Sequence, residues 1–321
     1  MVFYIKREVM DLYTRKWVAI NVVAGLVLTS GIGVMGAPAF AATAKTVHHQ
    51  QRKEKKALHK QVSAEALLKE LSINSNNIRY SQANIHQTET ISVAGQVKTI
   101  HLTETFQTER TGSNTMVLGT VSTSVPGIAA RQQLFINHNK MYMKSGKTPW
   151  VLMGSINSAK LSQLTQTINY MFQKVTVEHL KYSEVFHATL NPLTFSSMVQ
   201  QGLSVYTPSS SMPAMPANLA KAMAIMFQHV QANLIVIAHN VQGAERVASE
   251  KVTMTMAIPA KGMQTIATLV HPTQSTVTSS VYGPGNPIAM PAGAMKLSLW
   301  ETVNFTYGKA SIHVPAGIPA K

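Results

Sequence analysis

The side chains that most often carry acid–base chemistry are unevenly represented in this sequence. Cysteine is absent, and Asp11 is the only aspartate, so every acidic group after residue 44 is a glutamate. The lack of cysteine excludes disulfides, thiolate metal sites and a cysteine nucleophile. A Ser-His-Asp triad would need glutamate as its acid, and calcium or magnesium sites built from several carboxylates are disfavoured.

Two fragments of catalytic motifs occur, and each lacks the rest of its motif. Lys144-Ser145-Gly146 has the form of one element of the penicillin-recognising enzymes, but no serine after residue 44 has lysine three positions later. Gly146-Lys147-Thr148 has the form of the end of a P-loop, but Met141 stands where the first glycine is required. Neither G-x-S-x-G nor H-E-x-x-H is present. These fragments therefore predict no enzyme class.

Glutamates are the remaining candidates for catalysis, because a glycosidase needs only two carboxyl groups that converge. Most of them stand among polar residues, so we expect them on solvated faces. They include Glu89, Glu104, Glu109, Glu178, Glu184, Glu245, Glu250 and Glu301. The sequence therefore predicts a protein that is not an enzyme, with no cofactor and no metal site.

The first 44 residues have the organisation of a secretory signal peptide. A positively charged start over residues 6–16 precedes an uncharged apolar run over residues 17–35, and small residues before Ala41 or Ala44 fit a signal-peptidase site. We predict a signal peptide over residues 1–41, cut after Ala41 or Ala44, and a secreted or envelope-associated protein that is not a lipoprotein because it lacks cysteine. The alternative is an uncleaved anchor, since the run approaches the ~20 residues of a membrane span.

The chain is strongly basic, with 28 lysines and arginines against 13 acidic residues and a formal charge of +15. Removing residues 1–44 takes away four basic and two acidic groups, which leaves +13. Such a surface attracts anionic polymers or lipid head groups; nucleic acid is not expected for an exported protein. Residues 45–62 form a basic segment, interpreted as a solvated tether or as a contact with anionic membrane or wall polymer. The contact residues would be Lys45, Arg52, Lys53, Lys55, Lys56 and Lys60.

Hydrophobic periodicity after residue 62 predicts helices and strands in separate blocks. The expected elements are a helix from Ser63 to about Ser75, strands over 84–153, helices over 158–174, 193–201 and 218–231 with a strand over 182–190 between the first two, and strands over 234–314. The last block includes expected strands over 265–270 and 310–314, and Gly119 is expected to mark a bulge or bend. This order predicts an α+β domain over residues 63–316 with its helices on one face of an antiparallel sheet, followed by a tail over 317–321.

Methionine is the strongest positive signal, with eighteen in the chain and many on the expected inner faces. Flexible thioethers fill irregular cores, which is one interpretation, and they also line cavities that accept apolar ligands of variable shape. On the second interpretation the lining would be Met141, Met143, Met153, Leu164, Ile168, Met171, Phe172, Met223, Met226, Phe227, Met254 and Met256.

Three segments resemble parts of the LolA-like fold, which the LppX and LprG envelope lipoproteins share with related secreted proteins. Residues 63–69 are similar to the opening helix of that fold, residues 135–144 with Pro149-Trp150 to one of its hairpins, and residues 303–315 to its closing strand. The resemblance covers about 63–316. It implies a curved antiparallel sheet, an open half-barrel, with an N-terminal helix and mid-chain helices on the concave face. Members of the family typically bind lipids between sheet and helices without catalysis.

These observations favour an exported, non-enzymatic binder or carrier of a lipid or other apolar ligand at the cell envelope. The first alternative is a surface interaction protein with a filled core that binds anionic wall polymer or membrane. The second is a glutamate-based hydrolase, which would need two glutamates together in a cleft.

Overall fold

The computed structural model describes part of the chain. The described residues are 63–318 except 77, 94–95, 113, 125–130, 158–159, 161–171, 195–196, 198–200, 202–204, 209–229, 242, 263, 266–293 and 309–310. The expected signal peptide and the basic segment over 45–62 lie outside them, as does most of the three expected mid-chain helices. In the part of the chain that is described, no helix is long and apolar enough to cross a membrane.

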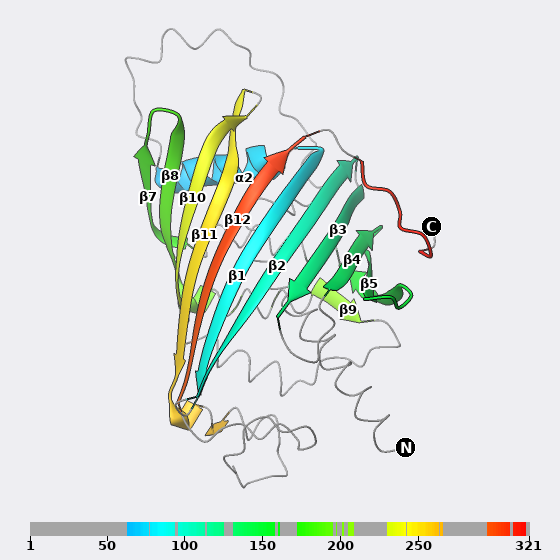
Figure 1. Ribbon diagram of the computed structural model, residues 1–321. Coiled ribbons are helices and arrows are strands. Elements are labelled where there is room, and N and C mark those ends of the chain that lie inside the picture. Colours follow the sequence, from blue (N-terminus) through cyan, green and yellow to red (C-terminus); the bar gives the residue numbers. More distant parts are fainter. Residues whose placement is uncertain are drawn as a thin grey trace.

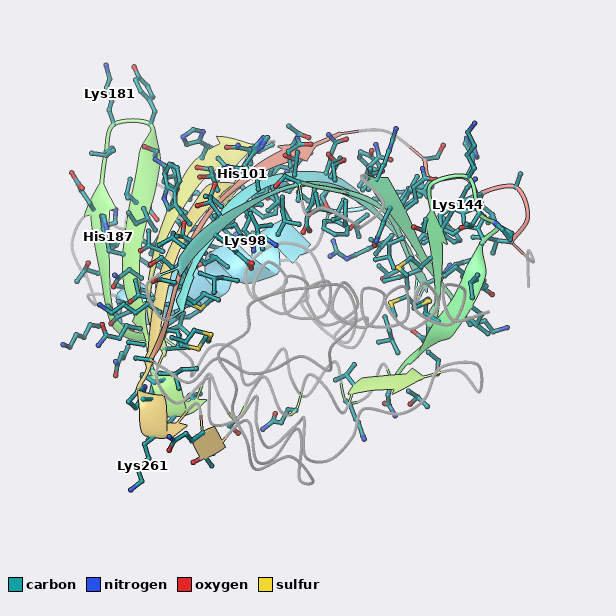
Figure 2. All side chains as sticks on the ribbon, turned by 60° about the horizontal axis from the view of Figure 1, so that its bottom comes forward. Lys98, His101, Lys144, Lys181, His187 and Lys261 are labelled. Carbon is teal, nitrogen blue, oxygen red and sulfur yellow. The ribbon has the colours of Figure 1, made fainter. Side chains whose placement is uncertain are left out.

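A single antiparallel sheet of twelve strands dominates the described residues, in the order β7-β8-β10-β11-β12-β1-β2-β3-β4-β5-β6-β9 (Figure 1). The strands are β1 (Tyr80–Val93), β2 (Gln96–Thr111), β3 (Asn114–Thr123), β4 (Arg131–Asn137), β5 (Lys140–Ser145), β6 (Val151–Ile156), β7 (Phe172–His179), β8 (Ser183–Leu190), β9 (Tyr206–Pro208), β10 (Val230–Val241), β11 (Ala244–Ile258) and β12 (Met295–Tyr307). The sheet bends into an arch in Figure 2. The large, open, curved antiparallel sheet that the resemblance implied is therefore confirmed.

The helix α2 (Ala64–Asn76) lies under the arch, as expected from the sequence. The hydroxyl oxygen of Ser63 accepts a hydrogen bond from the backbone N–H of Ala66 at 3.2 Å, which caps the free N–H groups of the first turn. Leu68 and Leu71 are buried on the side that packs against β11 and β7. The cap and this apolar face together fix the helix on the concave side.

Alternation of side chains gives the sheet an inner and an outer face. In β2, Ile100, Leu102 and Phe106 are buried under the arch, whereas Thr99 and His101 point outward and are exposed. Successive residues of a strand point to opposite faces, so this period of two places the apolar set in the concave core. The predicted faces of this strand are confirmed.

Several expected elements differ in the structure. The residues of 172–174 belong to β7 rather than to a helix, and β10 begins at Val230 inside another expected helix. Thr265 is helical rather than the start of a strand. Residues 311–315 form no strand, because β12 already has β11 and β1 on its two edges and the chain leaves the sheet after it.

Gly119 of β3 allows a close approach of an aromatic ring rather than a bulge. The pairing of β3 with β2 and β4 runs through Gly119 without a shift in register. A Cβ atom at this position would lie 2.5 Å from Cε1 of Phe106, closer than any carbon contact tolerates. The expected bulge is therefore absent at Gly119, and the glycine makes room for the Phe106 ring.

A second, smaller core lies on the convex face, under the C-terminal segment over residues 311–318. Tyr80, Phe135 and Tyr142 are buried there against Ile312 and Ile318. The rings of Phe135 and Trp150 add an edge-to-face contact with centroids 6.5 Å apart. The C-terminal segment therefore covers an apolar patch on the outside of the sheet.

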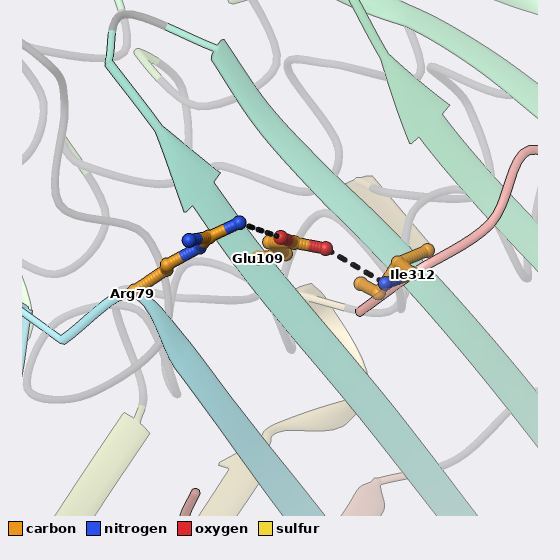
Figure 3. A network of polar contacts seen from close by, with 3 residues as sticks. All are labelled: Arg79, Glu109 and Ile312. Carbon is orange, nitrogen blue, oxygen red and sulfur yellow. Dashed lines mark hydrogen bonds and ion pairs between the residues drawn. The ribbon is translucent and has the colours of Figure 1, made fainter. Parts of the chain in front are cut away.

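Glu109 holds this segment in place through its carboxylate (Figure 3). One oxygen accepts the backbone N–H of Ile312 at 2.7 Å, and the other accepts the guanidinium of Arg79 at 3.1 Å. The hydrogen bond from Ile312 is the main reason that the pKa of Glu109 lies below its ordinary value. The bond supports the folded state at neutral pH and is lost as the pH falls through the lowered pKa.

Replacing Glu109 with glutamine is expected to loosen residues 311–318, because it removes a charge-assisted acceptor for a buried N–H, worth ~1.5–3 kcal/mol. Hydrogen exchange should show faster labelling of this segment than in the parent protein. Arg79→Gln should have a much smaller effect, since the Arg79 side chain is 73% exposed. Equal exchange in all three proteins would contradict the role given to Glu109.

Candidate functional site

Four glutamates lie on the concave face of four adjacent strands, and they define the candidate site. They are Glu250 on β11, Glu301 on β12, Glu89 on β1 and Glu104 on β2. Glu301 is paired with Gln87 of β1, two residues from Glu89 on the same face. Glu104 is paired with a residue of β1, and Glu250 is paired with a residue of β12, and both of these partners lie on the same concave face. We call these four residues the carboxyl row.

The carboxyl row is buried and has little to neutralise it. Each of the four side chains is at most 7% exposed. Among the described residues, none of the four forms an ion pair, and one oxygen each of Glu250 and Glu301 has no hydrogen-bond partner. Within the described part of the chain, Glu89 is the one member that accepts a side-chain hydrogen bond, from the amide of Gln87 at 2.8 Å. Polar groups buried in this way cost free energy unless a partner is supplied.

Burial raises the pKa of every carboxyl in the row. It is the largest cause of the shift that brings the pKa of Glu104 to about 8 and that of Glu301 to about 7. Neighbouring carboxylates add to it, Glu301 and Glu89 in the case of Glu104, and Glu89 in the case of Glu301. The pKa of Glu250 is raised well above its ordinary value, mainly by burial and secondly by the charge of Glu301. Burial also raises the pKa of Glu89. Glu104 and Glu301 therefore retain protons near neutral pH, so they can donate as well as accept hydrogen bonds.

The expectation that these glutamates lie on solvated faces is wrong for five of them. Glu89, Glu104, Glu250 and Glu301 are buried in the row, and Glu109 is buried beneath the C-terminal segment, while Glu178 and Glu245 are exposed. The neighbouring residues in the sequence suggested exposure, because threonine and glutamine surround several of these glutamates. Period-two alternation carried the missing signal. Glu104, for example, shares the face of Ile100, Leu102 and Phe106.

The predicted methionine lining falls in two separate places on the described sheet. Met141, Met143 and Met153 are buried on β5 and β6, and Met254 and Met256 are buried on β11. Strands β12, β1, β2, β3 and β4 separate the two groups. Phe172 starts β7 and is half-buried. The rest of the set (Leu164, Ile168, Met171, Met223, Met226 and Phe227) lies outside the described residues.

The donor set does not form a metal centre in the described part of the chain, where no three or more acidic or histidine side chains are grouped to hold an ion. The arrangement also differs from that of a hydrolytic carboxyl pair. Such a pair needs environments that push its two pKa values apart, so that one group is protonated while the other is ionised. In the row all four pKa values move upward together.

The structures that match this chain include two solved proteins with low TM-scores. No protein-family model matches the chain, and no curated protein matches it. Its structure matches that of a LolA superfamily protein from Nitrosomonas europaea, with 7% sequence identity, a TM-score of 0.23, and coverage of 78% of this chain and 96% of the other. It also matches a DUF1329 family protein from Desulfovibrio piger, with 5% identity, a TM-score of 0.21, and coverage of 72% and 85%. At TM-scores of this size, function has to be inferred from the chain's own geometry.

Proposed function

We propose that the chain is an exported, non-enzymatic binder or carrier of a lipid or another apolar ligand, held against the concave face of its sheet. The observation that carries this proposal is the carboxyl row within the concave core, between the methionines of β11 and those of β5. An occupant that contacts the row would supply hydrogen-bond partners to its buried carboxyl groups, which lowers the free energy of the complex.

The ligand that suits this face is an amphiphile whose polar end donates hydrogen bonds or carries a positive charge. Carboxyl groups with raised pKa values accept such a partner in two ways, by hydrogen bonding when protonated and by ion pairing when ionised. An anionic head group would instead add repulsion to a row that already resists ionisation. This polarity is opposite to the one that the basic composition of the whole chain favours.

Export and attachment to the envelope rest on the N-terminal sequence. Residues 1–41 act as the signal peptide in this proposal, and the basic segment over 45–62 supplies a weak electrostatic contact with anionic membrane or wall polymer. Isolation of the protein from outside the cytoplasmic membrane should therefore give an N-terminus at Ala42 or Lys45.

A displacement experiment tests the ligand class. The isolated protein is loaded with Nile red, an uncharged apolar dye, and titrated at pH 8 with dodecyltrimethylammonium or dodecyl sulfate below their micellar concentrations. The cationic amphiphile is expected to displace the dye at a concentration lower by about tenfold, because it alone can pair with the row.

The triple substitution Glu104→Gln, Glu250→Gln and Glu301→Gln should abolish that preference, whereas Glu178→Gln on the exposed side of β7 should leave it intact. Failure of the protein to bind Nile red, with no lipid found on organic extraction, would reject the carrier proposal. Equal displacement by the two amphiphiles would reject the role of the row.

A further inference from the structure

The outer surface of the four strands that hold the carboxyl row has a different chemistry. Twelve outward-facing residues form it: Lys251, Thr253 and Thr255 of β11, Ser298, Trp300 and Thr302 of β12, His86, Thr88 and Thr90 of β1, and Thr99, His101 and Thr103 of β2. All are exposed or half-exposed, and none is acidic. We call this surface the Trp300 face; it lies on the outside of the arch, where Figure 2 labels His101.

Trp300 is a large apolar side chain on this face, and it is not buried in the core. Its side chain is 58% exposed, and its paired neighbours on the two adjacent strands are Thr253 and Thr88. The hydroxyl of Thr88 lies 3.2 Å from Nδ1 of His101, so hydrogen-bonding groups continue beyond the ring. A large indole surrounded by hydroxyl groups presents an apolar surface within a polar one, the composition that recognition surfaces favour.

Charge divides across these four strands. The acidic side chains of the row point inward, whereas Lys251, His86 and His101 point outward, and Lys296 is exposed further along β12, beyond Ser298. The described C-terminal segment packs over Tyr80, Phe135 and Tyr142 rather than over Trp300. The described residues of the Trp300 face are exposed or half-exposed and are neutral or basic, which complements an anionic partner.

We propose that the Trp300 face binds an anionic glycan polymer. The indole would stack on the apolar C–H face of a sugar ring, and threonine and serine hydroxyls would bond to the ring hydroxyls. Lys251 and Lys296 would pair with acidic groups along the polymer. A lipid surface fits less well, because membrane-binding faces carry several large apolar side chains together, and this face has one. The proposal goes beyond ligand carriage and does not depend on it.

The test compares two polymers that share a β-linked glucose backbone and differ in charge, carboxymethylcellulose and hydroxyethylcellulose. Binding of the mature chain to each is measured by biolayer interferometry at about 0.15 M salt, which screens unspecific attraction. Trp300→Ala is expected to weaken binding to both polymers by at least about tenfold, as for a central aromatic contact. Lys251→Ala with Lys296→Ala should weaken binding to carboxymethylcellulose alone.

Tyr182→Ala provides the matched control, because Tyr182 is also an exposed aromatic residue, at 78%, but lies at the turn between β7 and β8. It should bind as the parent does, and Trp300→Phe should retain part of the affinity. Three results would overturn the proposal. The first is unchanged polymer binding by Trp300→Ala, and the second is an equal loss of binding in Trp300→Ala and Tyr182→Ala. The third is a parent protein that binds neither polymer but self-associates or binds liposomes, with that association lost in Trp300→Ala.

Discussion

Replacing Glu104 and Glu301 together with glutamine is expected to raise the melting temperature at pH 8, by on the order of 10 °C. Both carboxyls are buried without an ion-pair partner among the described residues, and their pKa values lie at about 8 and about 7. In the unfolded chain they ionise near pH 4.5. Glutamine keeps the shape of the side chain and removes the charge that burial penalises.

The parent protein should lose stability as the pH rises. Between about pH 4.5 and the raised pKa values, the folded state binds more protons than the unfolded state, so the free energy of unfolding falls with increasing pH. The fall continues at least to about pH 8, where Glu104 ionises in the folded state. Below pH 4.5 the lowered pKa of Glu109 acts in the opposite direction. Maximum stability is therefore expected near pH 4.5.

Thermal unfolding followed by circular dichroism at pH 5, 6.5 and 8 measures this dependence. The double variant should show a flatter profile, with the remaining slope due to Glu250 and Glu89, while Glu178→Gln, on an exposed position of β7, should follow the parent. A double variant that still loses stability between pH 5 and pH 8 as the parent does would show that the row is ionised or solvated. If the double variant is more stable than the parent and also discriminates less between the two amphiphiles, the row consists of binding residues that lower the stability of the fold.

Gly119→Ala is expected to destabilise the fold by ~2–3 kcal/mol, although it adds a single methyl group. That methyl would lie 2.5 and 2.6 Å from two atoms of the Phe106 ring, which is 3% exposed and packed on the concave side of β2. A buried ring of this kind can move only by displacing its neighbours. The strain should therefore appear as a lower midpoint of urea unfolding with an unchanged slope.

A second substitution identifies the clash as the cause. Phe106→Leu should be destabilising alone, but together with Gly119→Ala it should cost less than the sum of the two changes, because the smaller side chain vacates the space that the methyl needs. Gly308→Ala serves as the control, since nothing lies within 4 Å of a Cβ atom at that position. Additive losses in the double variant would contradict the account of Gly119.

Local sequence patterns predicted the fold where the forces are local. Ser63 caps its helix, and alternation in β2 and β11 places Ile100, Met254 and Met256 inside. The hairpin of β4 and β5 follows from Asn139 and the neighbouring His138, both with positive φ at its turn. The curved sheet agrees with the resemblance of the chain to the LolA-like fold.

Features that depend on distant segments were not predictable in the same way. Glu109 is an outward-pointing polar residue in the sequence, and only residue 312 arriving on the convex face turns it into a buried anchor. The need for a glycine at position 119 comes from the Phe106 ring on a neighbouring strand. The carboxyl row escaped prediction because its four glutamates come from four different strands, and the row exists only once those strands are placed side by side.

The placement of β12 has a consequence for how the protein is made. This last strand lies between β11 and β1, so residues 81 and 307 are paired in the middle of the sheet. Because a chain is synthesised from its N-terminus, β1 and β11 each keep an unpaired edge until the segment that forms β12 has been made. Unpaired strand edges promote association with other chains. Assembly of the arch is therefore a late event, and a chain shortened before residue 294 would present two open edges instead of a continuous sheet.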